Sequence, residues 1–205
     1  QENLNLSMRS LSIILFLFLS FSGHTQSLYS DTAYKKITPY ISLSEAILDT
    51  GNVQKLFLKK KKYIVIPKEI FEMTELEYLD LSKNKIDSIP LQIANLKNLR
   101  VLILSKNKIR SIPDTLYSLS KLKILDISAN DLTTLPRGIS GLESLEELNL
   151  WNTSAGDLPF DIDKLLKLKV IDMRGILLNF ETQDELLELL PNVKLYLSPP
   201  CNCSF

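Results

Sequence analysis

Side chains that usually perform acid–base or nucleophilic chemistry are few in this chain of 205 residues. Its one histidine is His24, so the chain beyond that residue cannot form Ser-His-Asp or Cys-His catalytic groups or a histidine metal site. The adjacent carboxylates Glu146 and Glu147 fall in a strand-like segment, where neighbouring side chains point to opposite faces and cannot flank one substrate. Gly138 and Gly141 lack the Lys-Ser/Thr pair of a phosphate-binding loop. We therefore expect no catalytic residue, no cofactor and no metal ion.

The two cysteines, Cys201 and Cys203, stand in a C-terminal Cys-Asn-Cys sequence. This close spacing would strain a disulfide between them, and two sulfurs are too few for a four-ligand structural metal site. We expect an exposed tail whose thiols are free, or are paired between chains in an oxidising compartment.

Basic and acidic residues balance at 24 each, which excludes the strong positive charge typical of nucleic-acid-binding domains. A hydrophobic content of 45% is enough to fill the core of one domain. The charges are nevertheless segregated, because residues 53–110 carry a net charge of +7 and residues 111–191 a net charge of −7. We expect a dipole along the molecule and no nucleic-acid partner.

The N-terminal tract resembles a secretory signal peptide. Met8 and Arg9 precede the apolar run 11–21, which is shorter than the roughly 20 residues that span a bilayer. Small and polar residues follow, so we expect cleavage between Gly23 and Ser27 and a mature chain with no membrane span, outside the cytoplasm. Residues 1–27 are then upstream residues and signal peptide; an uncleaved anchor is the alternative.

Most of the chain repeats with a period of 23 residues. Apolar residues fill positions one, four and six of each copy, and their alternation with polar residues predicts a short strand with one buried face. Five full copies and a sixth, broken one start at Val53, Leu76, Leu99, Leu122, Leu145 and Leu168.

Two further columns follow each predicted strand. An asparagine stands at position nine in three copies, and because a buried asparagine both donates and accepts, it can satisfy backbone groups where the chain turns inward. Thr153 at the same position can replace only part of that bonding. A proline in five successive copies favours a short helical or irregular return segment. These columns are Asn84, Asn107 and Asn130, and Pro67, Pro90, Pro113, Pro136 and Pro159.

The composite pattern LxxLxLxxNxLxxLPxxIxxL resembles the 23-residue class of the leucine-rich repeat family over residues 53–178. The resemblance implies an α/β solenoid: a right-handed arc with a parallel sheet on its concave side, short helical or irregular return segments, and a protein or peptide ligand on that sheet. It resembles secreted bacterial members, which favours a non-catalytic protein-binding module exported from a bacterial cell. A cytoplasmic signalling scaffold of the Ras-group type is the alternative.

Both ends of a solenoid need caps, because the terminal coils would otherwise expose their core. In the N-terminal cap, residues 28–52, the segment 42–49 is predicted to be a helix with Ser42 and Glu45 at capping-box spacing. In the C-terminal cap and cysteine-containing tail, residues 179–205, we expect a helix over 181–190 and an edge strand over 193–197.

Positions three, five and seven of each predicted strand point away from the core and form what we call the outer face of the sheet. Six strands spaced about 4.8 Å apart make this face on the order of 25 Å long. Tyr78, Val101, Ile103 and Ile124 should form a water-exposed apolar patch there, and tryptophan is common among residues that dominate binding energy. The predicted partner-binding residues are Tyr78, Asp80, Val101, Ile103, Ile124, Asp126, Asn149, Trp151, Asp172 and Arg174.

Lysines recur at positions eight and ten of the first three copies. Because residues 23 apart stack on a solenoid, these side chains should form a basic rim that attracts an anionic partner or a glycan; a merely solubilising surface is the alternative. The basic rim consists of Lys60, Lys62, Lys83, Lys85, Lys106 and Lys108.

Overall fold

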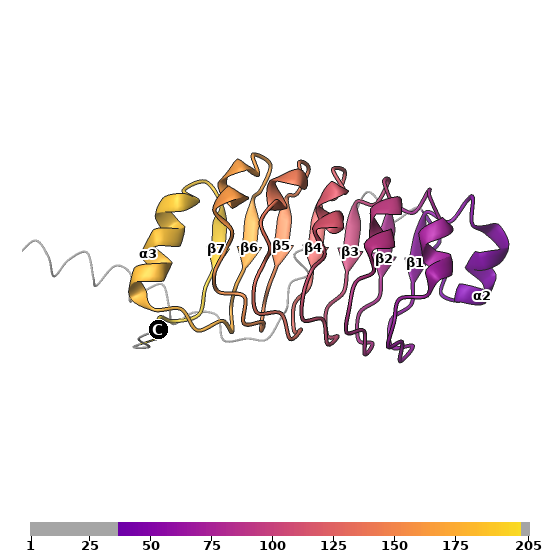
Figure 1. Cartoon of the computed structure of the whole chain (residues 1–205), viewed down its shortest axis with the longest axis horizontal. Helices are drawn as coiled ribbons and strands as arrows, with labels where there is room; N and C mark the ends of the chain where they lie inside the picture. The colour runs from indigo at the N-terminus through magenta and orange to yellow at the C-terminus, as the bar shows by residue number, and fades with distance from the viewer. Residues whose placement is uncertain (1–36, 202–205) are drawn as a thin grey trace, which may run out of the picture. The chain divides into compact units, whose positions relative to one another are not determined.

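Each copy of the 23-residue repeat forms one short strand in the computed structural model, which describes residues 37–201. Within this range the strands lie side by side in sequence order in one open parallel sheet (Figure 1). From β1 to β6 the register pairs residues 23 apart, such as Leu79 with Leu102. The predicted α/β solenoid is confirmed. The strands are β1 Lys55–Phe57, β2 Tyr78–Asp80, β3 Val101–Ile103, β4 Ile124–Asp126, β5 Glu147–Asn149, β6 Val170–Asp172 and β7 Lys194–Tyr196.

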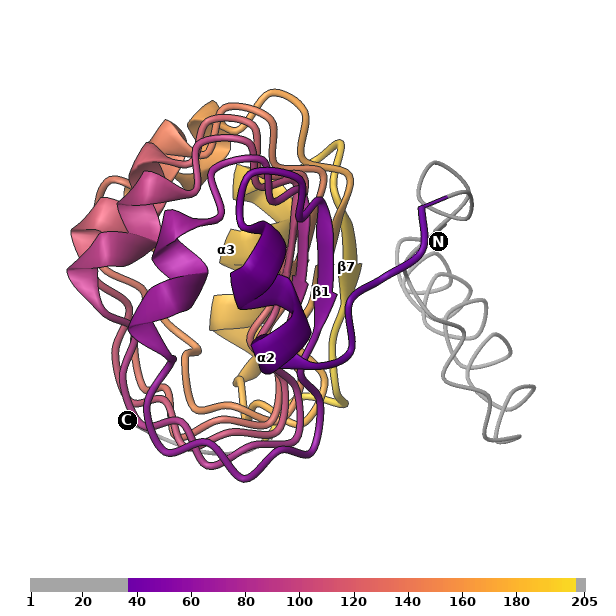
Figure 2. The same ribbon diagram turned by 90° about the vertical axis from the view of Figure 1, so that its right-hand side faces the viewer.

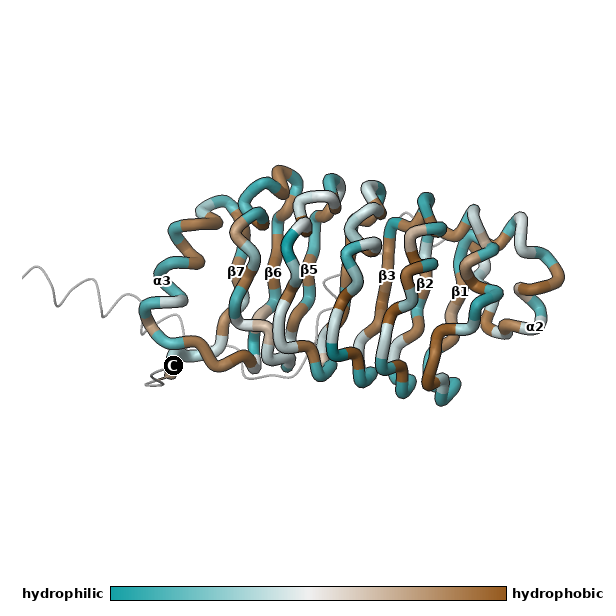
Figure 3. The backbone as a smooth tube through the Cα atoms, in the orientation of Figure 1, coloured by the Kyte–Doolittle hydropathy of each residue, from teal (hydrophilic) through white to brown (hydrophobic). Residues whose placement is uncertain are grey.

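The core lies between the sheet and the return segments, as the end-on view of Figure 2 shows. Leucines and isoleucines at positions one, four and six of successive coils stack into one continuous cluster; Leu79, Leu102 and Leu125 are fully buried in it. Each coil buries its apolar side only against its neighbours, so constant coil length is what keeps the core continuous. Figure 3 shows the result as hydrophobic stretches that recur along neighbouring coils.

The return segments are short 3-10 helices on the side opposite the sheet (Figure 2), which confirms the predicted short helical path. A proline whose ψ is extended precedes four of them directly. The fourth helix is shorter and follows Gly138, whose φ is 97°. Gly141 ends this helix, and a Cβ there would lie 2.5 Å from the carbonyl oxygen of Tyr117, so the position requires glycine. The helices are η3 Lys68–Glu72, η4 Leu91–Asn95, η5 Asp114–Ser118, η6 Ile139–Gly141 and η7 Phe160–Lys164.

The asparagine column forms the predicted buried ladder. The Asn107 amide nitrogen donates to the carbonyl of Leu104 in its own coil at 2.8 Å and to that of Leu81 in the preceding coil at 3.1 Å. Its Oδ1 accepts the amide of Ile86, also in the preceding coil, at 3.0 Å. Asn84 and Asn130 repeat this arrangement one coil earlier and one coil later.

Thr153 replaces only part of this bonding, as predicted. Its hydroxyl donates to Leu150 at 2.8 Å and accepts the amide of Ala155 at 3.4 Å. Both partners belong to the same coil, so this side chain does not connect its coil to the preceding one.

Position eight of every coil adopts the left-handed backbone conformation. The φ angles lie between 51° and 84° at Lys60, Lys83, Lys106, Ala129, Asn152 and Gly175. For residues other than glycine and asparagine this conformation costs roughly 1–2 kcal/mol. The turn between each strand and its ladder asparagine therefore requires a positive φ, and three rim lysines adopt this φ although it is unfavourable for lysine.

At the N-terminal end, α2 Leu43–Ala46 and η2 Ile47–Asp49 form the predicted cap helix. Ser42 is its N-cap residue but makes no capping bond, because its hydroxyl pairs with that of Ser44 at 2.7 Å. The predicted capping box is therefore wrong. Tyr40 pairs with Leu56 beside β1 and covers the first edge of the sheet.

At the C-terminal end, α3 Phe180–Leu189 and strand β7 confirm the predicted helix and strand. The helix begins one residue earlier than predicted, because the side chain of Asn179 accepts the amide of Thr182 at 2.8 Å and caps it. The domain boundaries at residues 53 and 178 stay a prediction.

Cys201 is disulfide-bonded, so the prediction of a free thiol is wrong for this residue. Cys203 and the predicted signal peptide lie outside the described residues. Across residues 37–201, no helix combines the length and the apolar character needed to cross a membrane.

Replacing Asn107 by alanine is expected to lower the free energy of unfolding by about 2–4 kcal/mol, because two buried carbonyls and one buried amide lose their partner. Urea denaturation followed by circular dichroism measures the change. Asn98→Ala is the control: this side chain donates a solvent-exposed bond to Thr74, and its loss should cost less than about 0.5 kcal/mol. Equal losses in the two variants would contradict the structural role of the ladder.

Candidate binding surface

The strand register determines which predicted binding residues are neighbours on the outer face. Position three forms a row from Lys55 in β1 to Lys194 in β7, and position five a row from Phe57 to Tyr196. The predicted residues thus lie in adjacent rows of one sheet. They fall into two groups with different exposure, one over β1 to β4 and one over β5 to β7.

The apolar patch predicted over β2 to β4 is not exposed to water. Tyr78, Val101 and Ile103 retain at most 8% of their accessible surface, and only Ile124 is half-buried. Packing along the sheet accounts for part of this burial, because side chains on adjacent strands stand about 4.8 Å apart. Tyr78, for example, meets the ring of Phe57 edge-on with centroids 5.0 Å apart. The predicted exposure is wrong, and a partner-binding role of these residues stays a prediction.

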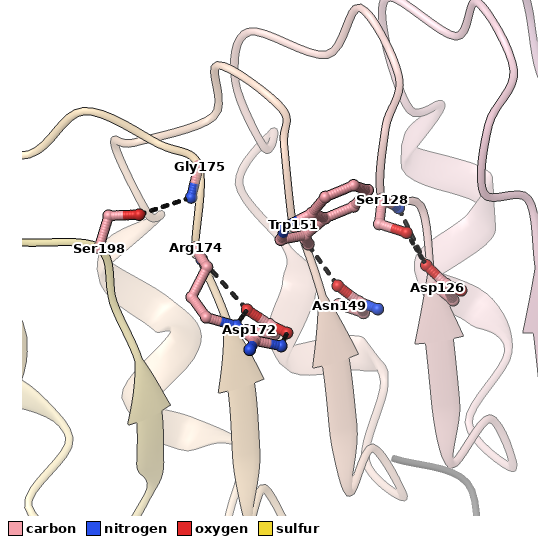
Figure 4. Close-up of polar contacts among 8 residues, drawn as sticks. All are labelled: Asp126, Ser128, Asn149, Trp151, Asp172, Arg174, Gly175 and Ser198. Carbon is pink, nitrogen blue, oxygen red and sulfur yellow. Dashed lines mark hydrogen bonds and ion pairs between the residues drawn. The ribbon is translucent and has the colours of Figure 1, made fainter. Parts of the chain in front are cut away.

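The acidic residues at position five bind their own backbone. Carboxylate oxygens of Asp80, Asp126 and Asp172 accept the amide two residues further on at 2.8–3.1 Å. The Asn149 side chain does the same for Trp151, and Figure 4 shows this bond beside those of Asp126 and Asp172. The three aspartates are buried, Asp172 to 2% exposure. These bonds fix the end of each strand where it enters the left-handed turn. Because the three carboxylates are also buried, little of their surface is accessible to a partner.

The accessible group lies over β5 to β7. Trp151 retains 39% of its surface, and Arg174 in the next coil is held by Asp172 through two bonds, Nε to Oδ1 at 2.9 Å and Nη2 to Oδ2 at 2.6 Å (Figure 4). The Arg174 guanidinium also stands 5.3 Å from the ring centroid of Tyr196, and Lys194 stands 4.6 Å from it. An exposed indole therefore lies one coil away from a fixed guanidinium on an aromatic ring.

Tyr196 was not predicted as part of this surface. It lies 24 rather than 23 residues after Asp172, its partner in the sheet, because α3 replaces the usual return segment between them. The alternation in Lys194-Leu195-Tyr196 could have predicted this position, because Leu195 points to the core and its two neighbours then lie on the outer face.

Glu146 and Glu147 face different environments, as their adjacent positions predicted. Glu146 receives hydrogen bonds from Lys169 and Lys123, which lower the pKa of its carboxyl. Glu147 lies on the outer face, and burial, with the charge of Glu146 beside it, raises the pKa of its carboxyl. The Oε2 atom of Glu147 is buried without a hydrogen-bond partner among the described residues. The outer face of β5 therefore carries a buried acceptor that lacks a donor among the described residues.

All six rim lysines are exposed at one end of the strands. Lys106, Lys59 and Lys60 are close enough to Lys83 to lower the pKa of its ammonium group by charge repulsion. Two position-ten lysines, Lys85 and Lys108, line an open pocket of about 590 Å³ together with Arg110, Ile64, Asp87 and Ser88. Arg110, two positions further along the same coil than Lys108, was not predicted as part of this surface.

No set of three histidine, cysteine, aspartate or glutamate side chains within residues 37–201 is arranged to hold a metal ion.

The repeat register, the asparagine ladder and the capped parallel sheet define a class of solenoid, and a family comparison names it. A model described as "Leucine-rich repeat region" matches residues 48–195, so the chain belongs to the leucine-rich repeat family. Members of this family are typically protein-interaction modules without catalytic activity. Comparison with curated protein sequences gives no match.

Solved structures give the same fold. A leucine-rich repeat protein of Leptospira interrogans superposes with a TM-score of 0.63 at 24% identity over 80% of this chain and 49% of its own. The plant peptide hormone receptor RGFR1, solved in complex with RGF2, gives 0.56 at 29% identity over 72% and 25%. The ectodomain of the receptor kinase SOBIR1 from Arabidopsis thaliana gives 0.53 at 28% over 72% and 74%. The chain thus spans about half of the Leptospira protein and a quarter of RGFR1.

Glu147→Gln is expected to stabilise the protein near pH 7 and to have no effect at about pH 3. Because the pKa of Glu147 is higher in the folded state, the unfolded chain ionises first as the pH rises, and stability falls. Glutamine removes this loss. The urea midpoint at the two pH values measures it.

Glu146→Gln is the matched control and should act with the opposite sign. The pKa of Glu146 is lowered by its lysine partners, so its charge contributes stability above the unfolded pKa, and that stability disappears as the pH falls through the folded pKa. Equal shifts in both variants near pH 7 would contradict these two environments.

Proposed function

We propose that this protein is a non-catalytic module that binds a peptide or a protein on the outer face of its sheet, over β5 to β7. The observation that carries the proposal is the exposed indole of Trp151, one coil before the Arg174–Tyr196 pair on the same sheet. Tryptophan, tyrosine and arginine are the residues that most often dominate binding energy at protein interfaces.

The geometry of this surface supports tight binding. The carboxylate of Asp172 is almost fully buried and accepts two hydrogen bonds from Arg174, so the guanidinium is ordered in the unbound protein. Ordering interface side chains in advance reduces the entropic cost of association.

The known relatives agree with this function. RGFR1, a plant peptide hormone receptor at 29% identity, was solved in complex with RGF2, and ectodomains of receptor kinases are among the similar structures. The chain spans a quarter of RGFR1, so peptide binding by this chain is our proposal. A chain without histidine beyond residue 24 also lacks the usual general base for enzymatic catalysis.

We further propose that the protein is exported from a bacterial cell. The positively charged start, the short apolar run 11–21 and the polar residues that follow have the composition of a signal peptide. The competing function, a cytoplasmic signalling scaffold, uses the same sheet but requires an uncleaved N-terminal tract.

Selection of a random peptide library displayed on phage against the immobilised protein tests the outer face. Enriched peptides should lose about thirtyfold in affinity on the Trp151→Ala variant, the effect of about 2 kcal/mol that is typical of a dominant interface residue. Arg174→Ala should also weaken them. Calorimetric titration of synthetic peptides measures both effects.

Phe160→Ala is the matched control for this experiment. Phe160 is an aromatic residue with 61% of its surface exposed, and it lies in η7 on the return side of the solenoid. Peptides should bind this variant as they bind the unaltered protein. Peptides that bind Trp151→Ala and Arg174→Ala without loss would refute the proposed site.

N-terminal sequencing of the protein isolated from its native host tests export. A first residue between His24 and Leu28 is expected from cleavage after the apolar run. A chain that begins at Met8 in the isolated protein would contradict export and favour the cytoplasmic scaffold.

A further inference from the structure

The position-eight lysines form a row whose spacing is set by the backbone. The amides of Lys60, Lys83 and Lys106 each donate to a carbonyl at position seven of the next coil, at 3.1, 2.8 and 2.9 Å. The row therefore repeats with the strand spacing of about 4.8 Å. A second row runs beside it, because the amide of Lys108 donates to Ile86 one coil earlier and that of Lys85 to Tyr63.

These lysines occupy sites that disfavour them. Glycine and asparagine tolerate the left-handed conformation, and later coils use Asn152 and Gly175 at this position. Three successive lysines with φ angles of 58–60° adopt it at a cost in stability. The fourth coil has Ala129 at the same position, with a φ of 51°.

The positive charges of the rim have few counter-charges nearby. Within residues 37–201, no ion pair involves any of the six rim lysines. Repulsion from Lys106, Lys59 and Lys60 lowers the pKa of Lys83 and outweighs the opposite effect of the Asp80 charge. In the pocket, Asp87 accepts a bond from Ser88 beside Lys85, Lys108 and Arg110. The row ends at Ala129 and Asp131.

The shape of this surface selects among anionic ligands. A protein interface needs an apolar centre, whereas the rim is two rows of charge with one exposed apolar side chain, Ile64, in the pocket wall. Single-stranded nucleic acid needs aromatic side chains for base stacking, and none lines the pocket. Regularly spaced cations beside an apolar wall match a chain of acidic sugars, whose rings have apolar faces.

We infer that the basic rim, together with Arg110, binds an acidic polysaccharide that runs along the solenoid across its first three coils. This site is separate from the peptide surface over β5 to β7 and does not depend on it. Export, proposed above, would bring the rim into contact with such polymers.

Calorimetric titration with heparin, which carries sulfates, and with polygalacturonate, which carries carboxylates, tests the inference. The variant Lys60→Asn/Lys83→Asn/Lys106→Asn removes three charges, and asparagine tolerates the left-handed backbone. We expect the affinity for at least one polymer to fall roughly tenfold or more at low ionic strength, with an unchanged or higher thermal midpoint. The preferred polymer identifies the anionic group.

The matched control is Lys97→Asn/Lys121→Asn/Lys167→Asn. It removes the same charge from exposed lysines of other coil positions, which bond to Ser118, Asn98 and Ser144, and it should change the affinity less than about twofold. Equal losses in both variants, or no binding of either polymer by the unaltered protein, would overturn the site. Single-stranded DNA that competes as well as the polysaccharides would overturn the ligand class. The Trp151→Ala variant should bind the polymers normally, which separates this inference from the peptide surface.

Discussion

A carboxamide that bonds to two coils at once is the constraint on which the rest of this structure depends. Each ladder asparagine satisfies carbonyls of its own coil and of the preceding one and accepts an amide from the preceding coil. Buried backbone groups without partners are costly, so the chain can turn away from the strand only where a coil of equal length lies beside it. The 23-residue period, the left-handed residue before each asparagine and the parallel register follow from that requirement.

The repeated part of the fold could be predicted from the sequence because each prediction rests on a column. A position that recurs five times, such as the leucines in the strand or the prolines before the return helices, has one physical explanation for all its members. Predictions that rest on a feature present only once were less accurate. Ser42 stands at capping-box spacing from Glu45, yet its hydroxyl bonds to Ser44. Tyr196 was not predicted as part of the outer face, because α3 lengthens the last spacing from 23 to 24 residues.

The binding surface was harder to predict than the fold because side-chain exposure depends on neighbours in other coils. Alternation placed Val101 and Ile103 correctly on the outer face, but it gave no measure of how closely large side chains on adjacent strands cover one another. It likewise assigned Asp126 and Asp172 to partner binding, although these carboxylates bond to amides two residues away. The exposed indole of Trp151 was predictable because it interrupts a column of serines.

The two proposed surfaces follow the segregation of charge along the chain. The first three coils carry the positive charge, and the coils after Arg110 carry the negative charge. Because the coils hold like charges in register, the electrostatic potentials of neighbouring rows add together. One end of the solenoid therefore attracts anions and the other end attracts cations.

The substitution of threonine for asparagine at position 153 makes the interfaces between coils unequal. In a one-dimensional array, stability is a sum of coil energies and of interfaces between adjacent coils. Thr153 bonds only within its own coil, so the interface between the fourth and fifth coils lacks the asparagine cross-link of the earlier joints. At this interface the buried carboxylate of Asp161 in the fifth coil accepts the amides of Gly138 and Ser140 in the fourth coil at 3.1 Å. The side-chain cross-link between these two coils therefore lies in the return segments and not at the ends of the strands.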